Sequence, residues 1–189
     1  YGELATYASY IQESTKKSYN LLNNLLEWSR VQTGSIQFNP VQVKFGEITD
    51  NVLGLINPGI HEKAITLHQD FDPDEKILAD RYMLETILRN LLNNAVKYTP
   101  EKGEIGIVLK KNKMFSEITV TDNGVGISKK NLDKLFQIEE YFSTPGIKNE
   151  KGSGIGLLLC KEFTEYHHGK ISVSSSPGKG SSFTVKLPL

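Results

Sequence analysis

Three asparagines and a lysine recur within one helical segment and together could bind a charged ligand. Residues 81–97 follow Asp80, a good N-cap residue, and their apolar side chains repeat at helical spacing. At about 100° per residue, the arc opposite the apolar face collects Asn90, Asn93, Asn94 and Lys97. Amide oxygens suit Mg²⁺, and a lysine brings positive charge to phosphates. Taken alone, the segment also fits an ordinary solvated face.

Two glycine-rich segments follow, and both suit close approach to a ligand. Residues 122–127 (Asp-Asn-Gly-Val-Gly-Ile) come after an alternating strand pattern, so Asp122 lies at a strand end. An ionised carboxylate only accepts hydrogen bonds and can therefore take the exocyclic amine of adenine. Residues 152–157 (Gly-Ser-Gly-Ile-Gly-Leu) open a helical pattern, where N–H groups and the helix dipole favour an anion. Taken singly, each segment also fits an ordinary turn or loop.

Composition narrows the class of protein. The 189 residues carry 22 Lys and Arg against 22 Asp and Glu, a balance that gives no reason to expect nucleic-acid binding. The single cysteine, Cys160, excludes an internal disulfide and sits in an apolar run typical of a core. No stretch approaches the roughly 20 apolar residues of a membrane span. Because the first residue is Tyr1, we expect a fragment of a longer protein.

The elements that must position these residues are a long helix and then a mixture of helices and strands. Residues 1–33 have apolar or small residues at steps of three and four, and Gly34 should end the helix. Helices are also expected at 46–57, 81–97, 128–137 and 155–167, the first interrupted by Pro58-Gly59 and the last stopped by Gly169. Strands are expected at 41–45, 64–71, 76–79, 104–110, 116–121, 170–175 and 182–187. This order predicts an α/β two-layer sandwich with a mixed, mostly antiparallel sheet, preceded by a long helix.

The order and spacing of the motifs resemble those of histidine-kinase catalytic domains, which belong to the superfamily of gyrase, a heat-shock chaperone and mismatch-repair ATPases. The matching segments are 90–98 (asparagine box), 122–127 and 152–157 (glycine boxes), 135–136 (phenylalanine box) and 178–183 (closing turn). Residues 25–34 are similar to the end of the second helix in the family's dimerisation and phosphotransfer hairpin. The resemblance implies residues 1–36 as that hairpin helix, and 37–189 as an ATP-binding domain with helices on one face of its sheet.

The resemblance also implies a role for each matched residue. Asn94 would bind Mg²⁺, Asn90 the phosphates or metal, and Lys97 a phosphate, which makes these three the expected catalytic residues. Tyr98 would pack near base and ribose, and Asp122 would bind adenine. The remaining ATP-binding residues would be Gly124, Gly126, Ile127, Phe136, Gly152, Ser153, Gly154, Ile155, Gly156 and Leu157.

The function implied is transfer of the γ-phosphoryl group of Mg-ATP to a histidine, in two-component signalling. Expected partners are a second copy, through the N-terminal helix, and a response-regulator receiver domain. The domain would be cytoplasmic, and whether its parent has a membrane anchor stays open. An ATP hydrolase is one alternative, but hydrolytic relatives have a glutamate at the place of Asn90, and an amide cannot be a general base. A non-catalytic nucleotide-sensing scaffold is the other.

Two features depart from the family pattern. No arginine follows Phe136, so the candidate substitutes are Lys148, Lys151 or a residue of the missing hairpin helix. Both lysines lie in a segment, 139–151, that is expected to form a lid. No histidine lies in residues 1–33, so the phosphoacceptor should lie outside this chain. His167 and His168 fit a structural role at a helix end, where a cation would complement the dipole.

Overall fold

The computed structural model describes residues 2–137 and 154–189, which form two compact units, Tyr1–Gln37 and Phe38–Leu189. The first unit is helix α1 (Gly2–Gln32). It ends as predicted: Gly34 has a φ of +64°, and the amides of Gly34 and Ser35 donate back to the carbonyls of Val31 and Arg30. This pair of hydrogen bonds satisfies carbonyls that the end of a helix leaves open.

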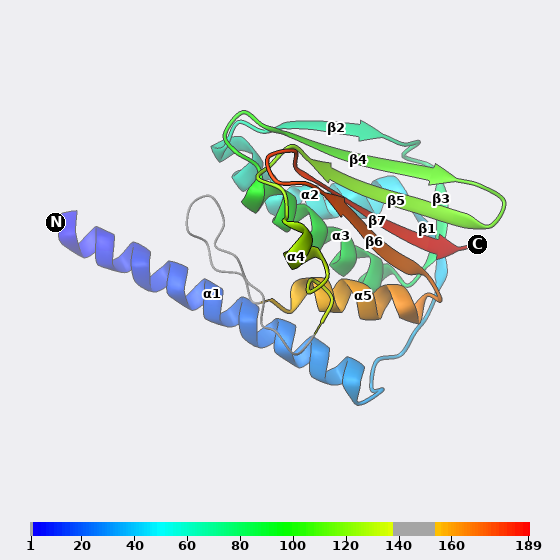
Figure 1. Ribbon diagram of the computed structural model, residues 1–189. Helices are drawn as coiled ribbons and strands as arrows, with labels where there is room; N and C mark the ends of the chain where they lie inside the picture. Colours follow the sequence, from blue (N-terminus) through cyan, green and yellow to red (C-terminus); the bar gives the residue numbers. More distant parts are fainter. Residues whose placement is uncertain (1, 138–153) are drawn as a thin grey trace. The chain divides into compact units, whose positions relative to one another are not determined.

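The second unit is a five-stranded sheet, in the order β2-β4-β5-β7-β6, with helices on one face (Figure 1). All neighbouring strands are antiparallel except the parallel pair β2–β4, which confirms the predicted two-layer fold. A separate antiparallel pair, β1–β3, was not predicted. The strands are β1 (Val41–Lys44), β2 (Thr66–Asp70), β3 (Lys76–Ala79), β4 (Glu104–Lys111), β5 (Phe115–Asp122), β6 (Lys170–Ser175) and β7 (Ser181–Pro188). The helices are α2 (Phe45–Glu62), α3 (Arg81–Tyr98), α4 (Lys129–Leu132) and α5 (Gly156–Tyr166).

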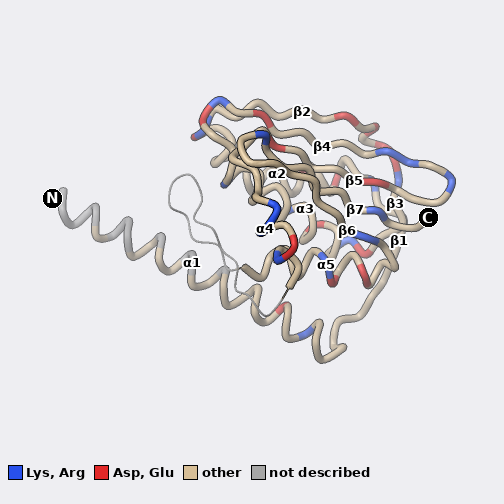
Figure 2. The backbone as a smooth tube through the Cα atoms, in the orientation of Figure 1, with Lys and Arg blue, Asp and Glu red and all other residues tan. Residues whose placement is uncertain are grey.

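The core lies between this sheet and helices α2, α3 and α5. Ile107, Val120 and Phe183 are paired neighbours across β4, β5 and β7, and all three are buried. Cys160 is fully buried on α5, and burial raises the pKa of its thiol, as expected for a core residue. Residues of both charge signs are interspersed along the backbone of this unit (Figure 2). Among the described residues, no helix is long and apolar enough to cross a membrane.

The predicted interruption of α2 at Pro58-Gly59 was wrong, because the helix continues to Glu62. Pro58 cannot donate to the carbonyl of Gly54, but both residues are exposed, so solvent can satisfy that carbonyl. Burial of Ile60 favours the extra helical turn. Two shorter differences concern helix ends: α4 covers only Lys129–Leu132, and His168, not Gly169, takes the left-handed position after α5, with a φ of +54°.

The start of α3 is fixed by a buried polar cluster. Asp80 caps the helix by accepting the amide of Met83 (3.0 Å), and its second oxygen accepts the amide of Asn39 (3.0 Å). The amide of Asp80 donates to Nε2 of His167 (2.9 Å), whose Nδ1 donates to the carbonyl of Phe163 (2.6 Å). The ring of His167 is therefore neutral, which corrects the prediction of a cation at this position. Burial lowers the pKa of His167, against the opposing effects of Phe163 and Asp80.

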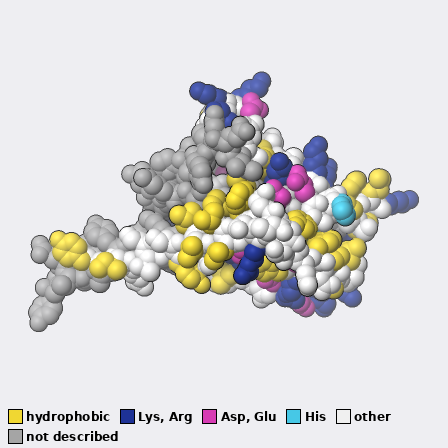
Figure 3. Space-filling model, turned by 90° about the horizontal axis from the view of Figure 1, so that it is seen from below, with side chains coloured by type: hydrophobic (Ala, Val, Ile, Leu, Met, Phe, Trp, Pro, Cys, Tyr) yellow, Lys and Arg dark blue, Asp and Glu magenta, His cyan; other side chains and the backbone are white. Residues whose placement is uncertain are grey.

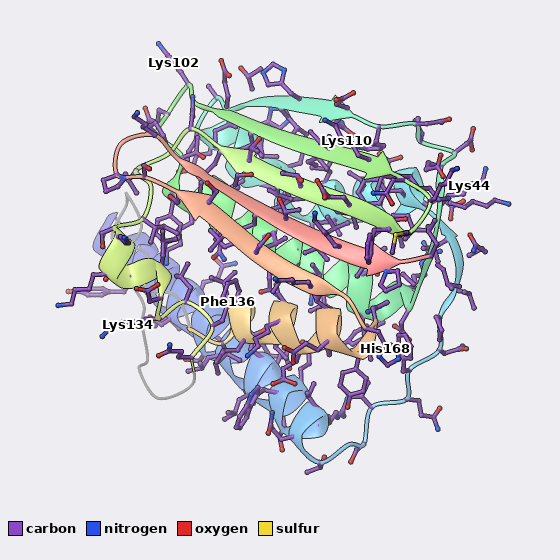
Figure 4. All side chains as sticks on the ribbon, turned by 45° about the vertical axis from the view of Figure 1, so that its right-hand side comes forward. Lys44, Lys102, Lys110, Lys134, Phe136 and His168 are labelled. Carbon is purple, nitrogen blue, oxygen red and sulfur yellow. The ribbon has the colours of Figure 1, made fainter. Side chains whose placement is uncertain are left out.

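We predict that His167 makes stability fall with acid. Its pKa in the folded chain lies below the ordinary 6.5, so below that pH the unfolded chain takes up a proton that the native chain refuses. The free energy of unfolding should therefore drop as the pH falls from about 7.5 to 5.5. Urea denaturation of His167→Gln should show lower stability but a weaker pH dependence. His168→Gln, at the exposed neighbour labelled in Figure 4, is the matched control and should keep most of the wild-type pH dependence, because His168 is the smallest of the causes that shift the pKa of His167.

Candidate active site

The polar arc of α3 is only partly exposed. Asn90, Asn94, Lys97 and Tyr98 are half-buried, whereas Asn93 is exposed and does not share their surroundings. The ammonium of Lys97 lies 4.8 Å from the ring centroid of Tyr98, a cation–π contact. The apolar face opposite them is buried, namely Met83, Leu84, Ile87, Leu88, Leu91, Leu92 and Ala95.

Asn90 joins α3 to the start of α5. Its amide Nδ2 donates to the carbonyl of Thr86 (2.9 Å), which leaves Oδ1 on the side of Gly156. A side chain added at Gly156 would come within 2.6 Å of that oxygen, so only glycine fits there without a shift. The asparagine segment and the second glycine segment therefore meet at Asn90 and Gly156.

The first turn of α5 offers backbone donors next to Asn90. Its N-cap residue is Ile155, which is buried and makes no side-chain capping hydrogen bond. Gly154 precedes it in the left-handed conformation, with a φ of +70°, and Leu157 is half-buried in the first turn. The start of a helix attracts anions, because its first N–H groups have no acceptor within the helix. Gly152, Ser153 and the predicted lid at 139–151 lie outside the described residues.

Asp122 lies at the end of β5, as its sequence position predicted. One carboxylate oxygen accepts the amide of Gly124 (2.9 Å). Burial raises the pKa of Asp122, and the backbone N–H groups of Gly124 and Ser181 partly oppose this effect. A half-buried carboxylate with remaining acceptor capacity is suited to a ligand that donates a hydrogen bond.

The segment after Asp122 packs tightly against α3. Gly124 is buried, and a side chain there would overlap the carbonyl of Tyr98, while the amide of Val125 donates to that same carbonyl (3.2 Å). Gly126 has a φ of +68° and abuts the carbonyl of Ser176. The first glycine segment thus contacts the last turn of α3, just as the second contacts Asn90.

Ser175 is a supporting residue that the sequence did not reveal. Its hydroxyl accepts the amide of Ile127 (2.8 Å) and donates to the carbonyl of Gly180 (2.7 Å). It thereby links the segment after Asp122 to the turn before β7. A serine in an alternating strand ordinarily indicates a solvent-facing position, so no pattern distinguished it.

Phe136 lies half-buried between α4 and the first turn of α5 (Figure 4), and its predicted place in the ATP site stays a prediction. Lys148 and Lys151, the candidate substitutes for arginine, lie outside the described residues. Within the described residues, no group of three His, Cys, Asp or Glu side chains could hold a metal ion. The amide oxygens of the half-buried Asn90 and Asn94 suit Mg²⁺, which commonly takes few protein oxygens beside phosphates and water.

Comparison with known proteins gives a consistent result. The family described as "Histidine kinase-, DNA gyrase B-, and HSP90-like ATPase" matches residues 79–189. The adaptive-response sensory kinase SasA of Crocosphaera subtropica is 30% identical over 89% of this chain and 44% of its own length. The circadian input-output histidine kinase CikA of Thermosynechococcus vestitus is 32% identical over 96% of this chain and 25% of its own length. The chain thus spans less than half the length of these curated relatives.

Solved structures agree on the fold. Full-length ShkA in complex with AMPPNP matches 98% of this chain and 39% of its own, with a TM-score of 0.80 and 26% identity. The histidine kinase ThkA in complex with the response regulator protein TrrA matches 98% of this chain and 51% of its own, with a TM-score of 0.76. At 22% identity, the second similarity concerns the fold alone.

We predict that Asp122→Asn weakens ATP binding roughly ten- to a hundredfold, because a hydrogen bond to a charged group is worth about 1.5–3 kcal/mol. Since the pKa of Asp122 is raised, wild-type affinity should also fall as acid protonates the carboxylate, and the Asn variant should lack this dependence. Calorimetric titration with ATP measures both effects. Asp74→Asn, at an exposed carboxylate paired with Lys44, is the control. Unchanged affinity in Asp122→Asn would contradict the assignment.

Proposed function

The chain belongs to the histidine kinase-, DNA gyrase B- and HSP90-like ATPase family, and we propose that it is the ATP-binding catalytic part of a sensor histidine kinase. In this proposal it transfers the γ-phosphoryl group of Mg-ATP to a histidine on a helix that this chain does not contain. Residues 1–36 would be the second hairpin helix and 37–189 the catalytic domain.

The observation that carries the proposal is that α3 contacts both glycine segments. Asn90 lies against Gly156 at the start of α5, and the carbonyl of Tyr98 lies against Gly124 and Val125. Segments far apart in the sequence therefore surround one polar helical face. Asp122 would bind the adenine amine at one end of that face, and the amides at the start of α5 would bind phosphate oxygens at the other.

The residues of α3 would hold the triphosphate between these two ends. Asn94 and Oδ1 of Asn90 are the proposed protein ligands of Mg²⁺, which supplies charge neutralisation on the phosphates when bound. Lys97 would pair with a phosphate, and the ring of Tyr98, already in contact with Lys97, would pack beside base and ribose. The remaining proposed ATP-binding residues would contact the nucleotide through their backbone or through apolar side chains. They are Gly126, Ile127, Gly154, Ile155 and Leu157.

The proposed chemistry is an in-line transfer. A nitrogen of the neutral acceptor imidazole attacks the γ-phosphorus, and the bond from that phosphorus to the β,γ-bridging oxygen breaks. ADP leaves, and the other imidazole nitrogen releases its proton. The chain's own contribution is to position the nucleotide and to place donors where negative charge accumulates.

Transfer is favoured over hydrolysis by the chemistry of Asn90. The side-chain nitrogen of Asn90 donates a hydrogen bond to the carbonyl of Thr86. The remaining amide oxygen cannot act as a general base toward water. A hydrolase would need a base at this position.

The proposed partners follow from α1 and from the relatives. Four neighbouring leucines on α1 are 44–55% exposed, and hydrophobic side chains of α1 are visible at the left of Figure 3. An apolar stripe of this kind favours association, so we propose that α1 forms a homodimer in the complete protein. The leucines are Leu21, Leu22, Leu25 and Leu26. A response-regulator receiver domain is the proposed acceptor of the phosphoryl group downstream.

We predict that Asn94 acts through the metal. Asn94→Ala should weaken binding of Mg-ATP far more than binding of ATP in the presence of a chelator, because an amide oxygen is lost from the metal rather than from the nucleotide. Fluorescence titration with and without Mg²⁺ measures the difference. Asn93→Ala, at the exposed neighbour on the same helix, is the control and should match the wild type. Equal losses with and without Mg²⁺ would argue against a metal ligand.

We predict that this chain does not phosphorylate itself. Its four histidines all lie outside α1, at positions 61, 68, 167 and 168, and His167 is locked by two hydrogen bonds. Transfer requires reacting atoms about 3–3.5 Å apart, which residues fixed within the domain cannot reach. Incubation with γ-labelled Mg-ATP should leave the chain unlabelled, and a phosphoacceptor hairpin supplied in trans should become labelled on histidine. Release of free phosphate would instead indicate a hydrolase, and binding alone a scaffold.

A further inference from the structure

Lys63 is a buried lysine whose ammonium group donates hydrogen bonds to the C-terminal end of α3. It follows α2 directly and is only 4% exposed. Its ammonium donates to the carbonyls of Val96 (2.7 Å), Lys97 (3.1 Å) and Thr99 (3.2 Å). An ammonium has three N–H donors, and here all three are satisfied by one stretch of backbone.

The accepting carbonyls are the ones that a helix leaves without partners. The last four carbonyls of an α-helix lack intrahelical donors, and they form the negative end of its dipole. The carbonyl of Tyr98, which lies within the same stretch, accepts the amide of Val125 (3.2 Å). From Val96 to Thr99, every carbonyl therefore has a partner: Lys63 for three of them and the segment after Asp122 for the fourth.

Lys63 is itself held firmly. Its amide donates to the carbonyl of Gly59 (3.2 Å), and its own carbonyl accepts the amide of Lys102 (2.8 Å). A side chain at Gly59 would lie 3.2 Å from a methyl group of Val96, so α2 and α3 approach closely where the lysine crosses between them. The ammonium is thus a fixed donor and not a flexible surface charge.

This stretch also carries two side chains of the proposed nucleotide site. Lys97 and Tyr98 lie within the turn that Lys63 holds, and the carbonyl of Tyr98 connects that turn to the segment that begins at Asp122. We propose that Lys63 is a positioning residue of the ATP site: it fixes the last turn of α3 and, through it, Lys97, Tyr98 and the backbone beside Asp122. This inference rests on the proposed function, because it assigns Lys63 a role in binding the same nucleotide.

The test compares Lys63→Met, which keeps the apolar stem but loses every donor, with the wild type. Affinity for the Mg²⁺ complex of a non-hydrolysable ATP analogue is measured by calorimetry, well below the unfolding midpoint of each variant. We expect a loss of about ten- to a hundredfold, the size of effect that follows when a charged hydrogen bond to the nucleotide, such as that of Lys97, is lost. Lys63→Arg, which keeps a charged donor, should recover part of the affinity. Lys44→Met is the matched control and should bind the nucleotide as the wild type does. Figure 4 shows Lys44 far from Lys102, whose amide donates to the carbonyl of Lys63.

A double-mutant cycle separates positioning from general loss of structure. If Lys63 acts through the last turn of α3, Lys63→Met should reduce the nucleotide affinity by a smaller factor in a Lys97→Ala background than in the wild type. If Lys63→Met does not fold, Lys63→Gln, which keeps a neutral donor, takes its place in the cycle. Unchanged affinity in the folded Lys63 variant would overturn the proposal. So would a double variant whose loss of binding free energy equals the sum of the losses in the two single variants. Failure of the wild type to bind any nucleotide would count instead against the proposed function.

Discussion

Burial of the apolar face of α3 is the constraint on which the rest of the site depends. Leu84, Ile87 and Leu88 are completely buried in the layer between α3 and the sheet. Each such side chain contributes about 1.5–3 kcal/mol when fully buried, so a rotation of α3 about its axis would be very unfavourable. Because side chains follow each other at about 100°, this one requirement also fixes the direction in which Asn90, Asn94 and Lys97 point.

Burial fixes the rotation of α3, and the charged or polar groups at its two ends fix its position along the axis. At the start, the carboxylate of Asp80 accepts the amide of Met83, and the ring of His167 accepts the amide of Asp80. At the end, the ammonium of Lys63 holds the carbonyls. A carboxylate at the N-terminus and an ammonium at the C-terminus both match the helix dipole, so the two anchors act in the same sense. The helix that would carry the metal and phosphate ligands is therefore held at both ends by neighbouring elements.

The sequence predicted what depends on local patterns. Helical periodicity located α3 to within a residue, and the alternation of apolar side chains located strands β4 and β5. Pairings between distant segments left no local pattern, so β1–β3 and the parallel β2–β4 pair were not predicted. Pro58 misled the prediction because propensity describes an isolated helix, whereas burial of Ile60 decides the outcome here. The roles of Lys63, Ser175 and His167 depend on partners more than 30 residues away in the sequence, and residue type alone describes each as an ordinary surface or helix-end position.

The identity of residue 90 shows how the fold and the chemistry constrain each other. Its side chain donates to the carbonyl of Thr86, and its oxygen lies against Gly156. An ionised carboxylate has no hydrogen-bond donor, so at this position it would repel the carbonyl oxygen of Thr86. An amide satisfies the carbonyl with its nitrogen and leaves its oxygen for a cation or a donor on the other side. In the proposed function, the amide of Asn90 can bind a cation or a hydrogen-bond donor but cannot accept a proton from water, which suits holding a phosphoryl donor for another acceptor better than hydrolysing it.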